Sequence, residues 1–126
     1  VPAIDAALKK LPVYDKPVVR GLKVKDLPKG FLGDHAKGNI VQYMGYSSTD
    51  KIKPYPGKIV QGIENHKGRA IGEFSLAGNE NEVLLPRSSM FQIDDLTPEG
   101  RKIIMKLCET LLPVKGRKVY QYALDK

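Results

Sequence analysis

The apolar residues of this chain fall mainly in short runs with the spacing of β-strands. Such runs, bounded by Gly, Pro, Asn or Ser, predict strands because successive side chains of a strand point to opposite faces. The predicted strands cover residues 17–24, 39–46, 58–63, 69–74, 80–86, 90–93 and 118–124. Between the first two, the segment 26–38 is rich in Gly and Pro and is expected to be a loop.

Two segments have helical spacing instead. Apolar residues at positions 4, 7, 8 and 11 predict an amphipathic helix that begins at Pro2 and ends before Pro12. Thr97 followed by Pro98 is a typical helix start, and apolar residues at 103, 104, 107, 108 and 111 predict a second helix that ends at Pro113. Short, mostly antiparallel strands with helices near both ends place the chain in the α+β class.

The length and composition are those of one globular domain. A chain of 126 residues can form a single core, so we expect one domain over residues 1–126. Apolar residues make up 41%, but no apolar run reaches the roughly 18–20 residues that span a bilayer, and we expect no membrane partner. No signal peptide is visible, and the start at Val1 suggests a processed or excised piece of a longer protein.

The positive charge is concentrated in the first part of the chain. The formal net charge is +7. Residues 1–70 hold 13 Lys or Arg and 6 Asp or Glu, a balance of +7, whereas residues 71–126 hold 8 of each and balance to zero. A basic half is typical of proteins that bind a phosphate, a nucleic acid or an acidic protein, although such charge also serves plain solubility.

Cysteine and histidine are too few for a disulfide or a zinc site. Cys108 is the only cysteine, and we interpret it as a core thiol on the second predicted helix. His35 and His66 are the only histidines, so no metal is expected. The sequence also contains neither a P-loop nor a Gly-x-Gly-x-x-Gly motif, which leaves those nucleotide-binding classes without support.

An arginine and two glutamates stand out within predicted strands. Arg20 follows two valines, and a buried guanidinium needs a carboxylate or phosphate partner, while Gly21 would let a ligand approach the backbone. Glu80 and Glu82 are two apart in a strand and therefore face the same way, where like charges repel. The alternatives are an edge-strand arginine that reaches solvent and a solvated strand end.

Two polar segments are weaker candidates. Ser47-Ser48-Thr49-Asp50 places three hydroxyl groups after Tyr46, although such residues serve turns and caps more often than chemistry. Residues 51–57 form a basic loop stiffened by proline around Tyr55. This loop could clamp a flat ring and a phosphate, or it could simply connect two strands.

Taken in order, three of these segments resemble a known family. Arg20 in a strand, the turn Tyr46-Ser47-Ser48-Thr49, and Glu80-Asn81-Glu82-Val83-Leu84-Leu85-Pro86 are similar to the mono-ADP-ribosyltransferase toxins. The similarity is to the Arg–Ser–Glu branch, which includes cholera toxin and the actin-modifying clostridial toxins, and it covers roughly residues 3–93. The chain departs from this branch at Asp50, where the usual Ser-Thr-Ser motif has its last serine, and a carboxylate there could alter cofactor affinity.

The resemblance implies a fold and a reaction. The fold would be two small, mostly antiparallel sheets packed at a steep angle, with flanking helices and with NAD, the co-substrate, in the cleft between them. Glu82 would stabilise the cationic sugar that forms when nicotinamide leaves, and Ser48 would hold Glu82 in place. Glu80 would orient or deprotonate the acceptor.

The resemblance also implies the residues that bind NAD. Arg20 would bind the NAD phosphate, and the backbone of Gly21 would contact the nicotinamide amide. Ser48 and Thr49 belong to the same motif, and Tyr55 could stack on the nicotinamide ring.

The acceptor and the biological setting follow from the family alone. A Glu at the position of Glu80 goes with arginine acceptors, so the resemblance implies a target protein with an acceptor arginine. It further implies a bacterial toxin or effector domain, secreted or delivered into the cytoplasm of a target cell, whose producer needs a cognate immunity protein. Three alternatives stay open: ADP-ribosylation of RNA, hydrolysis of NAD by water, and a non-catalytic binding module.

Overall fold

Strands make up most of the computed structural model, which describes residues 2–54, 56–74, 78–111 and 115–124. The strands are β1 (Val13–Tyr14), β2 (Val18–Leu22), β3 (Ile40–Tyr43), β4 (Ser47–Asp50), β5 (Ile59–Glu64), β6 (Gly68–Ala70), β7 (Glu82–Leu85), β8 (Ser89–Glu99), β9 (Lys102–Glu109) and β10 (Val119–Tyr122). The helical elements are α1 (Pro2–Leu8), α2 (Phe31–Asp34) and the 3-10 turns η1 (Val24–Asp26) and η2 (Gly72–Phe74). The strands form one sheet in the order β1-β6-β7-β4-β2-β5-β9-β8-β3-β10.

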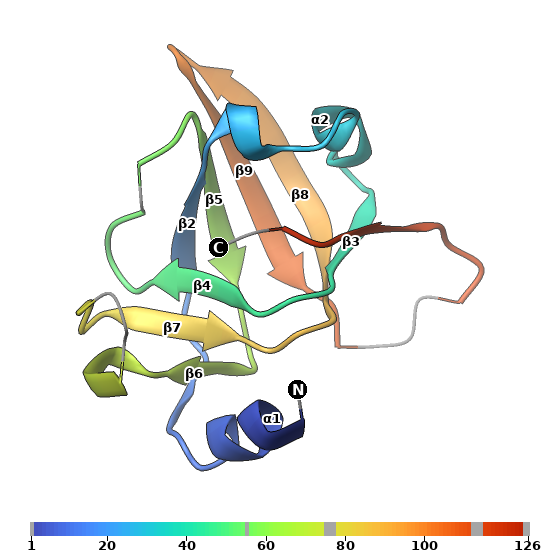
Figure 1. The fold of residues 1–126 in the computed structure, drawn as a ribbon. Coiled ribbons are helices and arrows are strands. Elements are labelled where there is room, and N and C mark those ends of the chain that lie inside the picture. The colour runs from blue at the N-terminus through green and yellow to red at the C-terminus, as the bar shows by residue number, and fades with distance from the viewer. Residues whose placement is uncertain (1, 55, 75–77, 112–114, 125–126) are drawn as a thin grey trace.

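One residue pair joins the two parts of this sheet. The register between β2 and β4 consists of Val19 opposite Asp50, whereas β4 and β7 pair over four residues. A single residue pair does not keep the axes of β2 and β4 aligned. Accordingly, β4, β6 and β7 run across β2, β5 and β9 (Figure 1). The predicted α+β class is confirmed at this level. The predicted pair of separate packed sheets is wrong, because the Val19–Asp50 pairing joins all ten strands into one sheet.

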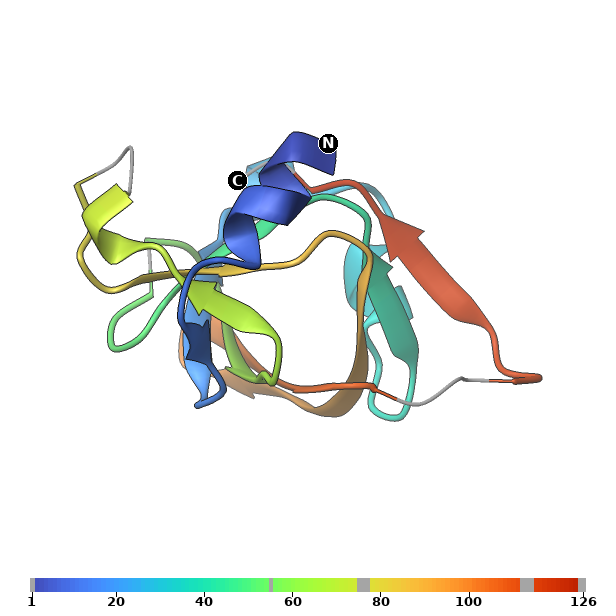
Figure 2. The ribbon, with the colours of Figure 1, turned by 90° about the horizontal axis from the view of Figure 1, so that it is seen from below.

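The larger part of the sheet is mixed. β5 pairs with β9 in parallel and β10 pairs with β3 in parallel, while the other pairings are antiparallel. Figure 2 shows β3 and β10 on one side of the molecule and β6 with η2 on the other. The predicted dominance of antiparallel pairing therefore holds, with two exceptions that the sequence pattern did not reveal.

The hydrophobic core lines the inner face of the larger part and includes two residues of β7 from the smaller part. In β2, Val18 and Leu22 are buried, and Arg20 faces the same side because it lies two residues from each. The core consists of Val18, Leu22, Phe31, Val41, Tyr43, Ile59, Ile63, Val83, Leu85, Phe91, Ile93, Met105 and Leu107. A charged guanidinium thus lies between two apolar side chains on the buried face of β2.

The second predicted helix is wrong, because the segment from Thr97 onward forms a β-hairpin. β8 runs to Glu99 and β9 begins at Lys102. Gly100 has φ 61° in the first position of this two-residue turn, a conformation that glycine adopts readily in hairpins. Pro98 fits a strand here because it lies beyond the part of β8 that pairs with β3, so its missing N–H removes no bond on that side.

Several apolar residues that suggested the apolar face of a helix belong instead to β9, which pairs with β5. Ile103 lies opposite Ile59 and Leu107 opposite Ile63, so tertiary pairing overrides the helical spacing. Cys108 is half-buried rather than in the core, and its Sγ lies 3.8 Å from an Oε2 of Glu64. Burial and the surrounding carboxylates raise the pKa of this thiol, which makes it a poor nucleophile.

The first predicted helix is present but shorter than the pattern suggested. α1 ends at Leu8, which is buried, while Ile4 is 44% exposed. Asp5 ties this helix to the sheet, since its carboxylate accepts hydrogen bonds from the Tyr46 hydroxyl and from Arg87 at 2.7 Å. Both partners adjoin the ends of β4 and β7, so α1 supports the smaller part of the sheet.

Candidate active site

Two of the predicted site residues meet directly across β4 and β7. The Oγ of Ser48 donates a hydrogen bond of 2.5 Å to Oε2 of Glu82. The register places Asp50 opposite Glu82 and Ser48 opposite Leu84, so Ser48 and Glu82 are diagonal neighbours on one face. Glu82 is only 8% exposed, and the pairing therefore holds a carboxylate with a defined orientation.

Arg20 approaches the same strand from the core side. Its Nη1 donates to the Oγ of Ser47 at 3.2 Å, one residue before Ser48, and its Cζ lies 5.6 Å from the centre of the Tyr43 ring. Ser47 is a contact that sequence reasoning missed, because nothing in the pattern distinguished the two serines. Adjacent residues of a strand face opposite sides, so the contacts of Arg20 and Glu82 lie on opposite faces of β4. The binding of one NAD molecule by both residues stays a prediction.

The guanidinium of Arg20 has an unusual environment. Arg20 is 3% exposed, and burial lowers its pKa, although a guanidinium keeps its charge in proteins. Within the part of the chain that the structure describes, no carboxylate forms an ion pair with it. A buried cation of this kind is costly without an anion, so the site has the chemistry to accept a phosphate.

A polar network holds the ring on which Arg20 lies. The Tyr43 hydroxyl lies 2.7 Å from Nε2 of His35 and accepts a hydrogen bond from Nε2 of Gln61 at 2.8 Å. Because Nδ1 of His35 faces the carbonyl of Phe31 at 2.7 Å, Nδ1 carries the proton and Nε2 accepts from Tyr43. These three buried residues were missed from the sequence, since only tertiary packing brings them together.

Titration of this network is suppressed by the core around it. Burial lowers the pKa of His35 to about 4, against the smaller raising effects of the Phe31 carbonyl and of Asp34. Burial also raises the pKa of the Tyr43 hydroxyl. Both groups are therefore neutral near pH 7, and the platform under Arg20 does not add a competing charge.

The two glutamates of the Glu-x-Glu motif differ in position and exposure. β7 begins at Glu82, and Glu80 lies in the preceding turn, closed by a bond from the backbone N–H of Glu82 to the carbonyl of Asn79 at 3.1 Å. Glu80 is exposed whereas Glu82 is buried. The expectation that both share one strand face is wrong, since strand alternation does not apply to a turn.

The other predicted NAD contacts have mixed placements. The hydroxyl of Thr49 donates to the carbonyl of Val83 at 2.7 Å, and Thr49 is 0% exposed, so the structure gives it a role in joining the strands. Gly21 lies in the middle of the sheet, paired with Val60. Tyr55 lies outside the described residues. The binding of NAD by these residues stays a prediction.

Comparison with known proteins identifies the family. The model of the ADP-ribosyltransferase exoenzyme family matches residues 1–112. The chain belongs to this family. Among relatives, it is 29% identical over 117 residues to Mav of Mycobacterium avium, named as an NAD(+)–arginine ADP-ribosyltransferase, covering 86% of this chain and 14% of Mav. It is 31% identical over 90 residues to Tre1 of Serratia proteamaculans, named as an NAD(+)–protein-arginine ADP-ribosyltransferase, covering 71% of this chain and 20% of Tre1.

A solved structure supports the fold of this ADP-ribosyltransferase domain. The ATR domain of Salmonella SpvB superimposes with a TM-score of 0.77 at 24% identity, covering 86% of this chain and 69% of that chain. The chain thus corresponds to most of the SpvB domain, but it spans only a fifth or less of the length of Mav and Tre1.

Asp50 marks the departure of this domain from the Ser-Thr-Ser pattern of its branch. One carboxylate oxygen accepts the backbone N–H groups of Ile52 at 2.7 Å and Lys53 at 2.8 Å, and the other accepts Nδ2 of Asn79 at 2.8 Å. Burial raises the pKa of Asp50, but these donors outweigh burial and the net pKa is lowered. Asp50 is therefore a charged, satisfied group that organises two loops.

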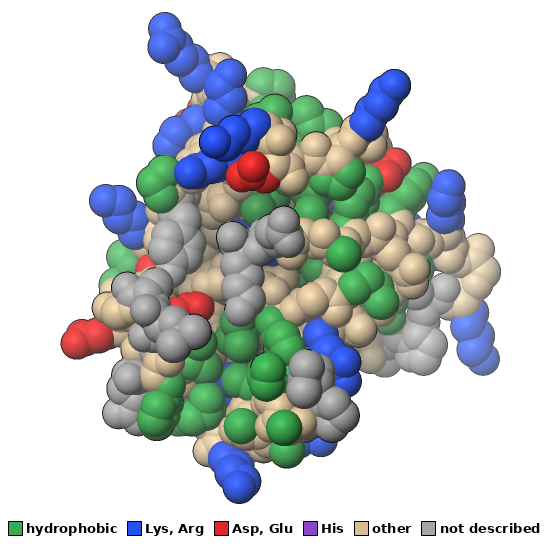
Figure 3. Space-filling model, viewed as in Figure 1, with side chains coloured by type: hydrophobic (Ala, Val, Ile, Leu, Met, Phe, Trp, Pro, Cys, Tyr) green, Lys and Arg blue, Asp and Glu red, His purple; other side chains and the backbone are tan. Residues whose placement is uncertain are grey.

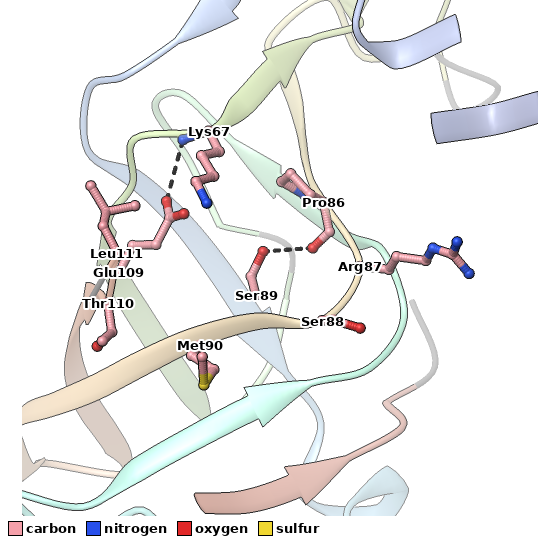
Figure 4. Close-up of a pocket in the computed structure, with 9 residues that line it drawn as sticks. All are labelled: Lys67, Pro86, Arg87, Ser88, Ser89, Met90, Glu109, Thr110 and Leu111. Carbon is pink, nitrogen blue, oxygen red and sulfur yellow. Dashed lines mark hydrogen bonds between the residues drawn. The ribbon is translucent and has the colours of Figure 1, made fainter. Parts of the chain in front are cut away.

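A separate hollow of about 300 Å³ lies at the opposite end of β7 from Glu82 (Figure 4). Glu109 closes one side by accepting the backbone N–H of Lys67 at 3.3 Å, and the Arg87 side chain points away from it (Figure 4). This hollow lacks every predicted site residue, so it is not the candidate active site.

The described residues show neither a metal cluster nor a membrane-spanning helix. Over the described ranges, no group of three or more His, Cys, Asp or Glu side chains could hold a metal ion. No helix in those ranges is both long enough and apolar enough to cross a membrane.

Proposed function

We propose that this domain is a mono-ADP-ribosyltransferase that cleaves the bond between nicotinamide and ribose in NAD and transfers ADP-ribose to an arginine of a target protein. The observation that carries the proposal is the hydrogen bond from Ser48 to Glu82. It brings together two motif residues 34 positions apart in a chain of the ADP-ribosyltransferase exoenzyme family. A structural role alone does not require a carboxylate at this place.

Glu82 carries the chemistry in this proposal. The sugar carbon becomes cationic as nicotinamide leaves with the bonding electrons, and a preorganised negative charge lowers the energy of that state. Ser48 fixes the orientation of this carboxylate, which directs its negative charge at the ribose in the proposed complex. Because NAD itself carries the leaving group, the proposed reaction implies no metal.

Arg20 is the proposed partner of the NAD diphosphate. Its support is the burial of a guanidinium that lacks a carboxylate ion pair within the described residues. A diphosphate would supply the missing anion, and the Tyr43 ring would help to orient the guanidinium.

The choice of a protein arginine rests on two observations. Mav and Tre1 are both named as arginine-modifying ADP-ribosyltransferases. Glu80 is exposed in the turn before Glu82, where an acceptor guanidinium can reach it from solvent. We therefore assign Glu80 to the acceptor and Glu82 to the sugar.

RNA is a less favoured acceptor. The chain carries a net charge of +7, which would attract any polyanion. On the face in Figure 3, however, Lys and Arg side chains project from separate places around the rim, apart from one group at its upper left. Single-stranded nucleic acid is typically gripped by a continuous basic groove interleaved with aromatic rings, whereas the basic side chains on this face are dispersed.

The setting is that of a bacterial toxin or effector delivered into a target cell. A domain that modifies host or competitor proteins needs delivery by a larger protein or secretion system, and its producer needs an immunity protein that blocks the site. Both partners are part of the proposal and follow from the family.

The test is an assay of NAD carrying a label on its adenylate part, added to a cell extract. We expect label on protein that neutral hydroxylamine releases, as is usual for an arginine linkage, and none with Glu82→Gln. Label on RNA would mean that RNA, and not a protein arginine, is the acceptor. Free ADP-ribose without bound label would make the domain a glycohydrolase, and NAD binding without nicotinamide release would make it a binding module.

A further inference from the structure

The turn that carries Glu80 and leads into Glu82 is tied to the loop after β4 by one side-chain pair. Asp50 Oδ2 accepts Nδ2 of Asn79 at 2.8 Å. The other end of the Asn79 amide, its Oδ1, accepts the backbone N–H of Asn81 at 3.0 Å. Glu80 lies between Asn79 and Asn81, so the Asp50–Asn79 pair fixes the backbone on either side of Glu80.

The opposite side of the same turn is packed against backbone. A Cβ added to Gly72 would lie 2.0 Å from the carbonyl oxygen of Glu80, so the backbones of these two segments are in contact there. The carbonyl of Asn81 also accepts the backbone N–H of Lys51 at 3.0 Å. Glu80 is therefore exposed at its side chain but held at its backbone from two sides.

Asp50 is placed where a negative charge is unfavourable. It lies directly opposite Glu82 in the β4–β7 register and is 7% exposed. Like charges in this position repel, yet the donors from Ile52, Lys53 and Asn79 compensate. A serine, the residue usual in this branch, has one oxygen and cannot bridge both loops in this way.

We propose that Asp50 is a positioning residue that, through Asn79, sets the share of ADP-ribose that reaches an acceptor guanidino group rather than water. The inference rests on the proposed function. In both outcomes the C1′–N bond to nicotinamide breaks and its electron pair leaves with nicotinamide. In transfer a guanidino nitrogen forms the new bond to C1′ and loses one proton, whereas in hydrolysis water forms the bond and loses one proton. Glu80 bears on the first outcome alone.

The structure allows a swap of the two partners. In Asp50→Asn the amide oxygen can still accept the N–H groups of Ile52 and Lys53, but its NH2 then faces the NH2 of Asn79. Flipping the side-chain amide of Asn79 would place its NH2 against the backbone N–H of Asn81. Neither orientation of Asn79 can therefore bond both residue 50 and Asn81. The double variant Asp50→Asn with Asn79→Asp restores the pair with donor and acceptor exchanged, and it leaves the net charge unchanged.

The experiment measures nicotinamide release and transfer to agmatine, a small guanidino acceptor, for the wild type, the two single variants and the double variant. We expect both single variants to lose roughly tenfold or more in the ratio of transfer to hydrolysis, with nicotinamide release within about threefold of wild type. The double variant should recover most of the ratio. Should Asp50→Asn fail to fold, Asn79→Ala removes the same bond at a partly exposed residue and should give the same loss.

A matched control separates this role from general stability. Asp95→Asn changes a carboxylate that likewise accepts a backbone N–H, from Leu96 at 3.0 Å, and a side-chain donor, Thr97 at 3.0 Å, but lies in the β8–β9 hairpin. It should leave the ratio unchanged. An active wild type with an unchanged ratio in Asn79→Ala, or no recovery in the double variant, would overturn the inference alone. A wild type that neither releases nicotinamide nor labels any acceptor would overturn the proposed function and this inference with it.

Discussion

Ser48 donates a hydrogen bond to Glu82 across two antiparallel strands, although 34 positions separate the two residues in the chain. The bond is possible because β4 and β7 pair with a register that makes these residues diagonal neighbours. It defines the orientation of the nearly buried Glu82 carboxylate, on which the proposed stabilisation of the cationic sugar depends.

Replacing Glu82 by Gln should reduce transfer and nicotinamide release by on the order of 10²–10³, because the amide lacks the charge that stabilises the cationic sugar. NAD binding measured by calorimetry and the thermal unfolding midpoint should stay close to those of the wild type, since Gln has the same shape and can still accept from Ser48. Wild-type activity in this variant would remove Glu82 from the assigned role.

Replacing Glu80 by Gln should act on the acceptor alone. Hydrolysis of NAD by water should continue, while transfer to protein or agmatine should fall, because the exposed carboxylate no longer attracts or deprotonates the guanidino group. The measurement compares free ADP-ribose with bound label at equal NAD turnover. Equal losses in both products would contradict a purely acceptor-directed Glu80.

Replacing Tyr43 by Phe should destabilise the fold by about 1–3 kcal/mol. The change leaves the buried Nε2 groups of His35 and Gln61 without the hydroxyl they bind, and an unsatisfied buried polar group has a cost of this size. The aromatic ring beneath Arg20 remains, so KM for NAD should change little. Urea unfolding is the measurement.

A matched control for this variant is Tyr120→Phe, whose hydroxyl makes no hydrogen bond with the residues that the structure describes. It should unfold within about 0.5 kcal/mol of wild type, because the change keeps the ring and leaves no hydrogen-bond partner unsatisfied. Similar losses in both variants would argue against a special role of the His35–Tyr43–Gln61 network.

The buried His35 should make stability depend on pH. Its pKa is about 4 in the folded chain and 6.5 in the unfolded chain, so between these values the unfolded state binds more protons. Stability from this residue is therefore complete above pH 6.5 and is lost as the pH falls towards 4, by up to roughly 3 kcal/mol. Urea unfolding at a series of pH values, with the His35 ring followed by NMR, checks this. A native-state pKa near 6.5 would contradict it.

Strands and motifs were largely readable from the sequence. The two valines before Arg20 predicted a partly buried strand, and the order of Arg20, Ser48 and Glu82 matched a family that the comparison then identified. The helix expected after Thr97 was wrong because the spacing of Ile103 and Leu107 is compatible with both a helix and a strand. Pairing with β5, which is distant in sequence, stabilises the strand.

By itself, the sequence determined which residues are chemically capable: a guanidinium among apolar neighbours, a hydroxyl pair, and two carboxylates beside an apolar strand. These follow from residue type and local spacing, which depend only on near neighbours in the chain. Tertiary structure alone decided that Ser47 and not Ser48 contacts Arg20, that Tyr43 carries its ring platform, and that Asp50 binds Asn79. Each of these contacts depends on strand register, and register is set by the packing of the whole sheet.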